Sequence, residues 1–320
     1  MGDLERLGVT DVRRRRCAGL YRRGQRPRLA DRRGNRRVTE PLRTLITPER
    51  LIHQLQAPGW VVVDCRHDLG NPDFGRAAYA KGHIPGAHFL HMDDELSGPR
   101  TGKNGRHPLP NPAALARRLG EIGINRDSQV VAYDDGGGMY AARLWWLLNW
   151  LGHRNVAVLD GGFQAWCSAN GLLSQKEVTP TPTRFNAEPQ PLSVDVNYVD
   201  SHKGSDAMLL IDARSPDRFR GENETIDPVG GHIPGAINRF FKDNLGADGR
   251  FKSAEQLRRE FTPLLAGRDP QQVVHQCGSG VTACHNLLAM EVAGLPGGRL
   301  YPGSWSEWCA CDSRKIARGA

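Results

Sequence analysis

The chain has 320 residues, of which 39% are hydrophobic and 24% are charged, and its formal net charge is +8. This composition is typical of a globular protein, and the length favours two domains over one. We expect no membrane partner, because no apolar run approaches about 20 residues, and no secretory signal, because no apolar segment follows the charges of the N-terminus. The seven scattered cysteines fit a reducing cytoplasm better than a disulfide scaffold.

Positive charge is concentrated in residues 1–43. This segment holds fourteen arginines, no lysine and five acidic residues, a net charge of +9, so the rest of the chain carries −1. We interpret it as a disordered Arg-rich extension, because it has too few large apolar side chains to bury a core. An arm that binds nucleic acid or an acidic partner is the alternative. The arginines lack interleaved aromatic residues, so we do not expect a nucleic acid partner.

Four blocks of sequence occur twice, in the same order and at similar spacing. Such a repeat predicts two copies of one structural unit. The paired blocks are residues 61–66 and 209–214, 82–87 and 231–236, 130–133 and 273–276, and 161–166 and 302–308.

Each copy is predicted to alternate strands with helices. Short apolar runs rich in β-branched residues are typical of buried parallel strands, and helical patterns lie between them. The fold class is therefore α/β, with two mainly parallel sheets flanked by helices. The expected strands are residues 61–64, 130–133, 157–159, 209–212 and 273–276, and the expected helices include 112–119, 141–151 and 285–292.

A proline-rich polar segment separates the two copies. Residues 173–193 contain four prolines and little periodicity, which predicts a linker. We therefore place a first domain at residues 44–172 and a second domain at residues 194–312.

The loop after the last expected strand carries the predicted nucleophile, Cys277. Gly278 and Gly280 let the backbone turn tightly so that amide groups point inward, and the following helix adds the positive end of its dipole. We expect the thiol to be ionised near neutral pH and the loop to stabilise a persulfide. Gly278, Gly280, Val281 and Thr282 are the expected contacts of the bound sulfur compound.

Aligning the two copies places Asp134 opposite Cys277. A carboxylate cannot take up a sulfane sulfur, which requires a thiolate nucleophile. We therefore expect the first domain to be catalytically silent and the second domain to carry the reaction.

These features resemble the two-domain rhodanese superfamily, and the loop Cys-Gly-Ser-Gly-Val-Thr is most similar to that of the 3-mercaptopyruvate sulfurtransferases. The resemblance covers about residues 45–310. It implies two tandem rhodanese-like domains, a Cys277 persulfide and no metal or organic cofactor. The implied partners are a small-molecule sulfur donor, 3-mercaptopyruvate, and an acceptor, which is cyanide, a small thiol or a thioredoxin-like protein.

The resemblance also implies groups that bind the donor and move protons. Arg218 matches the substrate-binding arginine of the family, whose planar guanidinium suits a carboxylate. Many mercaptopyruvate enzymes have a second arginine nine residues farther on, where this chain has Asp227, so Arg214 and Arg220 are alternative candidates for the second cation. A Ser–His–Asp relay is implied, with Ser279 as the serine, His83 as the histidine and Asp73 as the nearest candidate for the acid.

Three alternatives remain open. Cys277 would also serve a thiosulfate:cyanide sulfurtransferase, or hold a persulfide for sulfur trafficking without turnover. A protein phosphatase of the same fold would need an arginine where this chain has Ala283.

Overall fold

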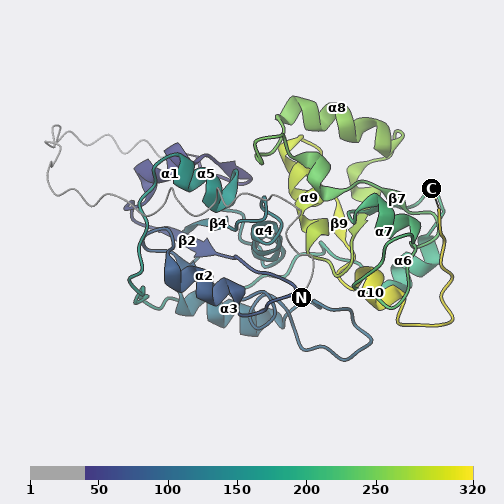
Figure 1. The fold of residues 1–320 in the computed structure, drawn as a ribbon, viewed down its shortest axis with the longest axis horizontal. Coiled ribbons are helices and arrows are strands. Elements are labelled where there is room, and N and C mark those ends of the chain that lie inside the picture. Colours follow the sequence, from purple (N-terminus) through teal and green to yellow (C-terminus); the bar gives the residue numbers. More distant parts are fainter. Residues whose placement is uncertain (1–39, 320) are drawn as a thin grey trace, which may run out of the picture. The chain divides into compact units, whose positions relative to one another are not determined.

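Two parallel sheets organise the chain (Figure 1). The computed structural model describes residues 40–319, so residues 1–39 of the predicted Arg-rich extension lie outside the described part. The first sheet has the strand order β1-β5-β4-β2-β3 and the second β7-β6-β8-β9. All of their strand pairs are parallel. The predicted α/β fold with two mainly parallel sheets is confirmed.

The first domain comprises the elements from β1 to α5. Its central strands are short apolar runs whose residues alternate between two covered faces, as the sequence predicts. The elements are β1 (Leu45–Ile46), α1 (Pro48–Gln54), β2 (Trp60–Asp64), α2 (Phe74–Lys81), β3 (His88–Phe89), α3 (Pro112–Glu121), β4 (Gln129–Tyr133), α4 (Ala141–Trp150), β5 (Val156–Leu159) and α5 (Gly162–Ser168).

The second domain comprises the elements from α6 to α10. No helix among the described residues is long and apolar enough to cross a membrane. The elements are α6 (Val196–His202), β6 (Leu209–Asp212), α7 (Pro216–Arg220), β7 (Ile237–Asn238), η1 (Phe241–Asn244), α8 (Ala254–Leu265), η2 (Pro270–Gln272), β8 (Val273–Gln276), α9 (Thr282–Val292), β9 (Arg299–Leu300) and α10 (Ser304–Trp308).

The two sheets repeat one another strand for strand. The second sheet, β7-β6-β8-β9, has the same order as β3-β2-β4-β5 of the first. Strand β1 has no counterpart of its own, but Ser193 forms a parallel bridge with Leu300 at the corresponding edge. The internal repeat in the sequence is therefore a repeat of structure.

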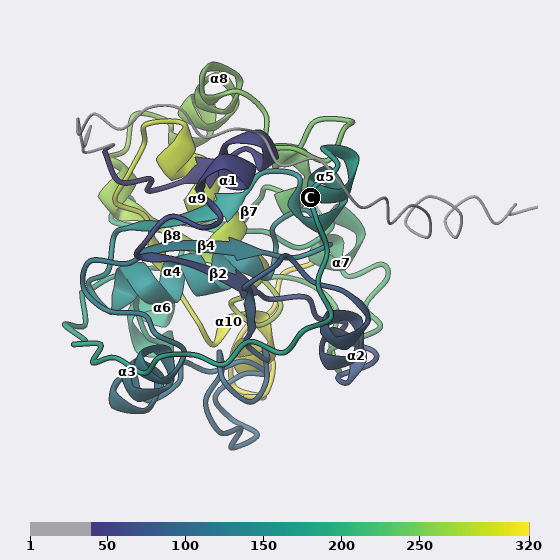
Figure 2. The same cartoon turned by 90° about the vertical axis from the view of Figure 1, so that its left-hand side faces the viewer.

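Helices cover both faces of each sheet (Figure 2). In the first domain α3 and α4 pack on one face and α1 and α5 on the other. In the second domain α8 and α9 cover one face, and α6 and α10 cover the other. Burial of apolar side chains on both faces is what makes such strands continuous hydrophobic runs.

The cores of the two domains meet where α4 packs against α9. Leu144 and Leu148 of α4 belong to the same buried cluster as Cys284 and Leu288 of α9. Each of these helices directly follows a loop at the end of a central strand, β4 or β8. The domain junction therefore lies beside both repeat-related loops, including the one that carries Cys277.

Candidate active site

Strand β8 ends at the residue before Cys277, and the loop that follows is fixed by the segment around α10. The Cys277 amide donates to Ser304 Oγ at 3.1 Å, and its carbonyl accepts from the Trp305 amide at 3.0 Å. Gly280 has a φ of +77°, and a Cβ there would lie 2.5 Å from Pro302 O. Glycine is therefore required at position 280 for both backbone conformation and space.

The Cys277 thiol lies in a buried site that favours a negative charge. The residue is 2% exposed, and its Sγ accepts a hydrogen bond from the Gly280 amide at 3.1 Å. Arg143 on α4 is fully buried and forms no salt bridge within the described part of the chain. Burial lowers the pKa of Arg143, and Cys284 and Cys277 oppose that shift. A buried cation without an acidic partner favours an anion nearby.

Cys284 is not the reactive thiol of this region. It is fully buried in α9, and its Sγ donates to Gly280 O at 3.3 Å. Burial raises the pKa of Cys284 to about 12, so this side chain stays neutral. Cys277, by contrast, lines a cavity.

The loop after β4 shows what the corresponding position holds in the first domain. The Asp134 carboxylate accepts four backbone hydrogen bonds of 2.7–2.8 Å, from the amides of Gly136, Gly138, Tyr140 and Ala141. These amides hold oxygens two bonds beyond Cβ. The outer sulfur of a cysteine persulfide also lies two bonds beyond Cβ. The corresponding loop after β8 therefore suits a persulfide anion whose outer sulfur occupies the position of the Asp134 oxygens.

A cavity of about 340 Å³ opens at Cys277. Residues of both domains line it, and none of its lining residues among those described is acidic. Its four basic side chains belong to Arg106, Arg214, Arg218 and Lys242. Arg106, Arg214 and Arg218 are each paired with an acid outside the lining, so the cavity presents their N–H donors and the charge of Lys242 to a small anion.

The structure gathers most of the predicted binding residues in this cavity. Arg218, Gly278, Val281 and Thr282 line it together with Cys277. Gly280 does not line it and acts instead through its amide, which donates to the sulfur.

Ser279 is contacted by His107 rather than by the predicted His83. His107 Nδ1 lies 2.7 Å from Ser279 Oγ, and His107 Nε2 lies 3.2 Å from Asp93 Oδ1, although this second contact is not aligned as a hydrogen bond. Burial lowers the pKa of His107, and Asp93 opposes that shift. The contact with His107 holds the pKa of Asp93 far below its usual range. A neutral imidazole between a hydroxyl and a carboxylate is an arrangement that transfers protons.

His83 and Asp73 lie elsewhere, which corrects the predicted relay. The His83 ring stacks on Tyr79 with 3.9 Å between centroids, and both ring nitrogens contact backbone carbonyls. His232 in the second copy stacks on Phe219 in the same way, at 3.8 Å. Asp73 is exposed and immediately precedes α2. The histidine that occurs in both copies, His83 or His232, therefore supports the fold. His107, which has no counterpart in the repeat, is the histidine that contacts Ser279.

The relay also contains a group of potential metal ligands. Ligand atoms of His67, Asp93 and His107 lie within 4.8 Å of one another. Neither ring nitrogen of the buried His67 has a hydrogen-bond partner among the residues that the structure describes, and burial lowers the pKa of this side chain. His107 and Asp93 already contact each other, so a metal ion would have to compete with the relay.

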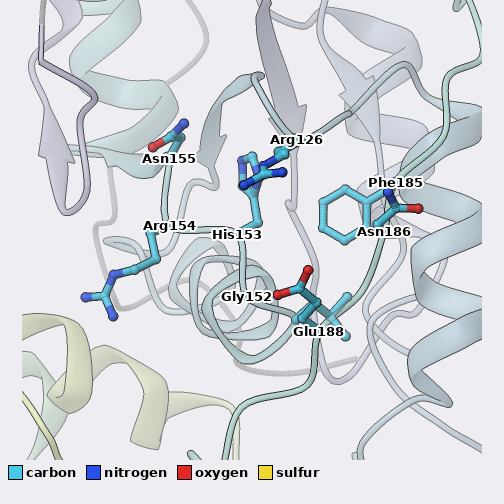
Figure 3. Close-up of a pocket in the computed structure, with 9 residues that line it drawn as sticks. Arg126, Gly152, His153, Arg154, Asn155, Phe185, Asn186 and Glu188 are labelled. Atoms are coloured by element: carbon cyan, nitrogen blue, oxygen red, sulfur yellow. The ribbon is translucent and has the colours of Figure 1, made fainter.

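A second cavity, of about 250 Å³, shares no residue with the first (Figure 3). Arg126, His153, Arg154 and Glu188 are among its lining residues. It is lined by no cysteine, serine or threonine. Among the described residues, this cavity therefore offers no thiol or hydroxyl that could accept sulfur, whereas the first cavity contains Cys277.

Comparisons with known proteins place the chain among the rhodanese-like sulfurtransferases. A model of the rhodanese-like domain matches residues 47–169 and 195–311. A probable 3-mercaptopyruvate sulfurtransferase of Pseudomonas aeruginosa is 50% identical over 278 residues, covering 86% of this chain and 98% of that protein. A putative thiosulfate sulfurtransferase of Mycobacterium tuberculosis is 39% identical, covering 86% and 97%. The solved 3-mercaptopyruvate sulfurtransferase of Leishmania major has a TM-score of 0.75 at 32% identity, covering 83% of this chain and 74% of that one.

Proposed function

Because the chain belongs to the rhodanese-like domain family and is a sulfurtransferase, we propose that it takes a sulfane sulfur from 3-mercaptopyruvate onto Cys277. The observation that carries this proposal is the cavity, whose lining holds the buried Cys277 thiol and the side chains of three arginines and one lysine, with no acidic residue among the described ones. A small keto acid with a thiol is the kind of donor that such a cavity attracts.

In the first step the Cys277 thiolate attacks the sulfur of the donor. The bond between that sulfur and carbon 3 breaks, and pyruvate leaves as its enolate. The thiol proton of the donor must reach carbon 3, which leaves a Cys277 persulfide anion and pyruvate. Ser279 and His107 are placed to carry this proton, because His107 Nδ1 lies 2.7 Å from Ser279 Oγ.

In the second step the outer sulfur of the persulfide passes to an acceptor. Cyanide takes it to form thiocyanate, and a thiol takes it to form a persulfide of its own, with Cys277 regenerated as thiolate in both cases. We propose a small thiol or a thioredoxin-like protein as the acceptor, and the cytoplasm as the compartment. Cys65, Cys277, Cys284, Cys309 and Cys311 form no disulfide within the described part of the chain, which suits a reducing environment.

Thiosulfate is the alternative donor, and the cationic cavity gives it specific support. Thiosulfate is a dianion, and the relative from Mycobacterium tuberculosis carries that name. The residues that follow the nucleophile, Gly278 and Ser279, are uncharged, which favours the singly charged keto acid.

Intact-mass measurement after mixing with 3-mercaptopyruvate tests the covalent step. We expect a gain of one sulfur atom, which Cys277→Ser abolishes. Steady-state rates with both donors then test the preference, and a higher kcat/KM for thiosulfate would overturn the donor assignment. A persulfide that forms but is not discharged to cyanide or small thiols would indicate a carrier without turnover.

A further inference from the structure

Arg106 belongs to the first domain but is seated against the second. Its backbone amide donates to Ser306 Oγ at 3.0 Å. The preceding Gly105 has a φ of +81°, and a Cβ there would lie 2.6 Å from Gly303 O. This close backbone approach fixes the segment beside the catalytic loop, and Arg106 lines the cavity at Cys277.

The guanidinium groups of Arg106 and Arg218 converge on the residue after the nucleophile. A Cβ placed on Gly278 would lie 2.7 Å from Arg106 Nη2, and 3.5 and 3.8 Å from Arg218 Nη2 and Nη1. The space over Gly278 is therefore bordered by two cations that come from different domains. A side chain at this position would fill that space.

Asp227 joins the two arginines. One of its carboxylate oxygens contacts Arg106 Nη1, and the other accepts from Arg218 Nη2 at 3.1 Å. The Asp227 side chain is 2% exposed, compared with 21% for Arg106 and 17% for Arg218. The carboxylate therefore lies behind the guanidinium groups and is absent from the cavity lining.

These contacts leave two donors free beside Gly278. Glu224 accepts from Arg218 Nε and Nη2 at 2.9 Å, so one edge of that guanidinium is occupied. Arg106 Nη2 and Arg218 Nη1 donate no hydrogen bond to any residue that the structure describes. Two N–H donors from separate guanidinium groups suit the two oxygens of a carboxylate.

We propose that Arg106 and Arg218 together bind the carboxylate of the sulfur donor, with Asp227 holding Arg106 in place. The inference rests on the proposed function and adds a residue that the catalytically silent domain supplies. It also gives Asp227 a role: an acid at this position pairs with Arg106, the cation that the first domain supplies in place of a second arginine from the second domain.

Steady-state kinetics of Arg106→Ala with 3-mercaptopyruvate test this clamp. We expect KM to rise by about 10- to 100-fold, the usual loss for one charge-assisted hydrogen bond, with a smaller change in kcat. Discharge of a preformed Cys277 persulfide to 2-mercaptoethanol should keep its wild-type rate, because that acceptor has no carboxylate. Arg117→Ala, an exposed arginine on α3 of the same domain, is the matched control and should leave KM unchanged.

Charge exchange provides a second test. Arg106→Asp alone places two carboxylates together and should raise KM further, whereas Arg106→Asp with Asp227→Arg restores one cation and one anion and should recover much of the loss. An unchanged KM in Arg106→Ala, or an equal loss in the discharge step, would overturn the clamp alone. A wild-type chain that gains no sulfur from 3-mercaptopyruvate would overturn the proposed donor and the clamp with it.

Discussion

His107 contacts Ser279 through one ring nitrogen and approaches Asp93 through the other. The carboxylate favours a proton on Nε2, which leaves Nδ1 to accept the proton of the Ser279 hydroxyl. Arg100 also binds Asp93, so the acid end of the relay is neutralised by a cation. The protonation state of His107 at a given pH therefore decides whether the serine is activated.

Replacing His107 separates the relay from the fold. We expect His107→Asn to lower kcat with 3-mercaptopyruvate by about 100- to 10,000-fold, the range for loss of a general acid–base group. His83→Asn removes a ring that stacks on Tyr79 and contacts two backbone carbonyls, so it should lower the melting temperature and leave kcat nearly unchanged. The opposite result, with kcat lost only in the His83 variant, would restore the relay inferred from the sequence.

The pH dependence of kcat/KM should report the lowered pKa of His107. Burial lowers this pKa, and the charges of Arg143 and Arg100 act in the same direction. As the pH falls, His107 therefore stays neutral below the ordinary histidine value of about 6.5, and the acid limb should lie below it. Asp93→Asn removes a group that raises the pKa of His107, so the limb should move to still lower pH.

A parallel measurement separates histidine from thiol titration. The rate of Cys277 alkylation over the same pH range follows the thiolate, whereas the relay contributes only to turnover. An acid limb at or above pH about 6.5 that does not follow alkylation would contradict the lowered pKa of His107.

At the level of secondary structure, the sequence predicts the helices and strands, because these depend on residues that are close together in the chain. Strands such as β4 and β8 and helices such as α3 are apparent because hydrophobic periodicity is local, and the repeat identifies them twice. Cys277 and Ser279 share one loop, so a single local motif indicates both. The contact between His107 and Ser279 joins residues 172 positions apart, in a segment without a repeat partner, so no local pattern indicates it.

The same limit applies to the second cation of the cavity. The sequence shows an acid at Asp227 where an arginine was expected, but not that Arg106 reaches this acid from the first domain. Their proximity depends on how the loop before α3 meets the loop after α7. Tertiary packing sets that arrangement, so local propensity does not reveal it.

The loop between β4 and α4 gives a prediction for one structural element. Asp134 is fully buried and accepts four amide hydrogen bonds, so Asp134→Asn turns one acceptor oxygen into a donor that faces N–H groups. We expect the free energy of unfolding in urea to fall by about 1–3 kcal/mol. Asn149→Asp, which replaces a buried amide on α4 with an acid, provides the reverse substitution for comparison of the unfolding free energies.

The measurement also tests the silent role of the first domain. The folded fraction of Asp134→Asn should keep its kcat, because sulfur is bound by the other loop. An unchanged free energy of unfolding would mean that the amides of this loop do not stabilise the Asp134 carboxylate. It would then not support the comparison with a Cys277 persulfide in the loop after β8.

At the scale of the whole molecule, Arg143 ties the two domains together at the nucleophile. From α4 it donates to Gly280 O at 3.0 Å in the second domain, and to His107 O at 3.1 Å in the first. One buried cation thus positions both the Cys277 loop and the relay histidine. The proposed active site draws on residues of both domains, so we expect it to form only when the domains are joined.

Arg143→Met tests this junction, because methionine keeps much of the length and removes the charge and all donors. The His107 carbonyl loses its donor and the Gly280 carbonyl keeps only the weak donor Cys284 Sγ, so we expect the unfolding free energy to fall by about 1–3 kcal/mol. The rate of Cys277 alkylation at neutral pH should also fall, since the thiolate loses a buried cation. Arg143→Lys keeps the positive charge but not the guanidinium hydrogen bonds. Its alkylation rate should therefore stay closer to the wild-type value than its unfolding free energy does. Wild-type alkylation in a folded Arg143→Met variant would show that the amides of the Cys277 loop alone sustain the thiolate.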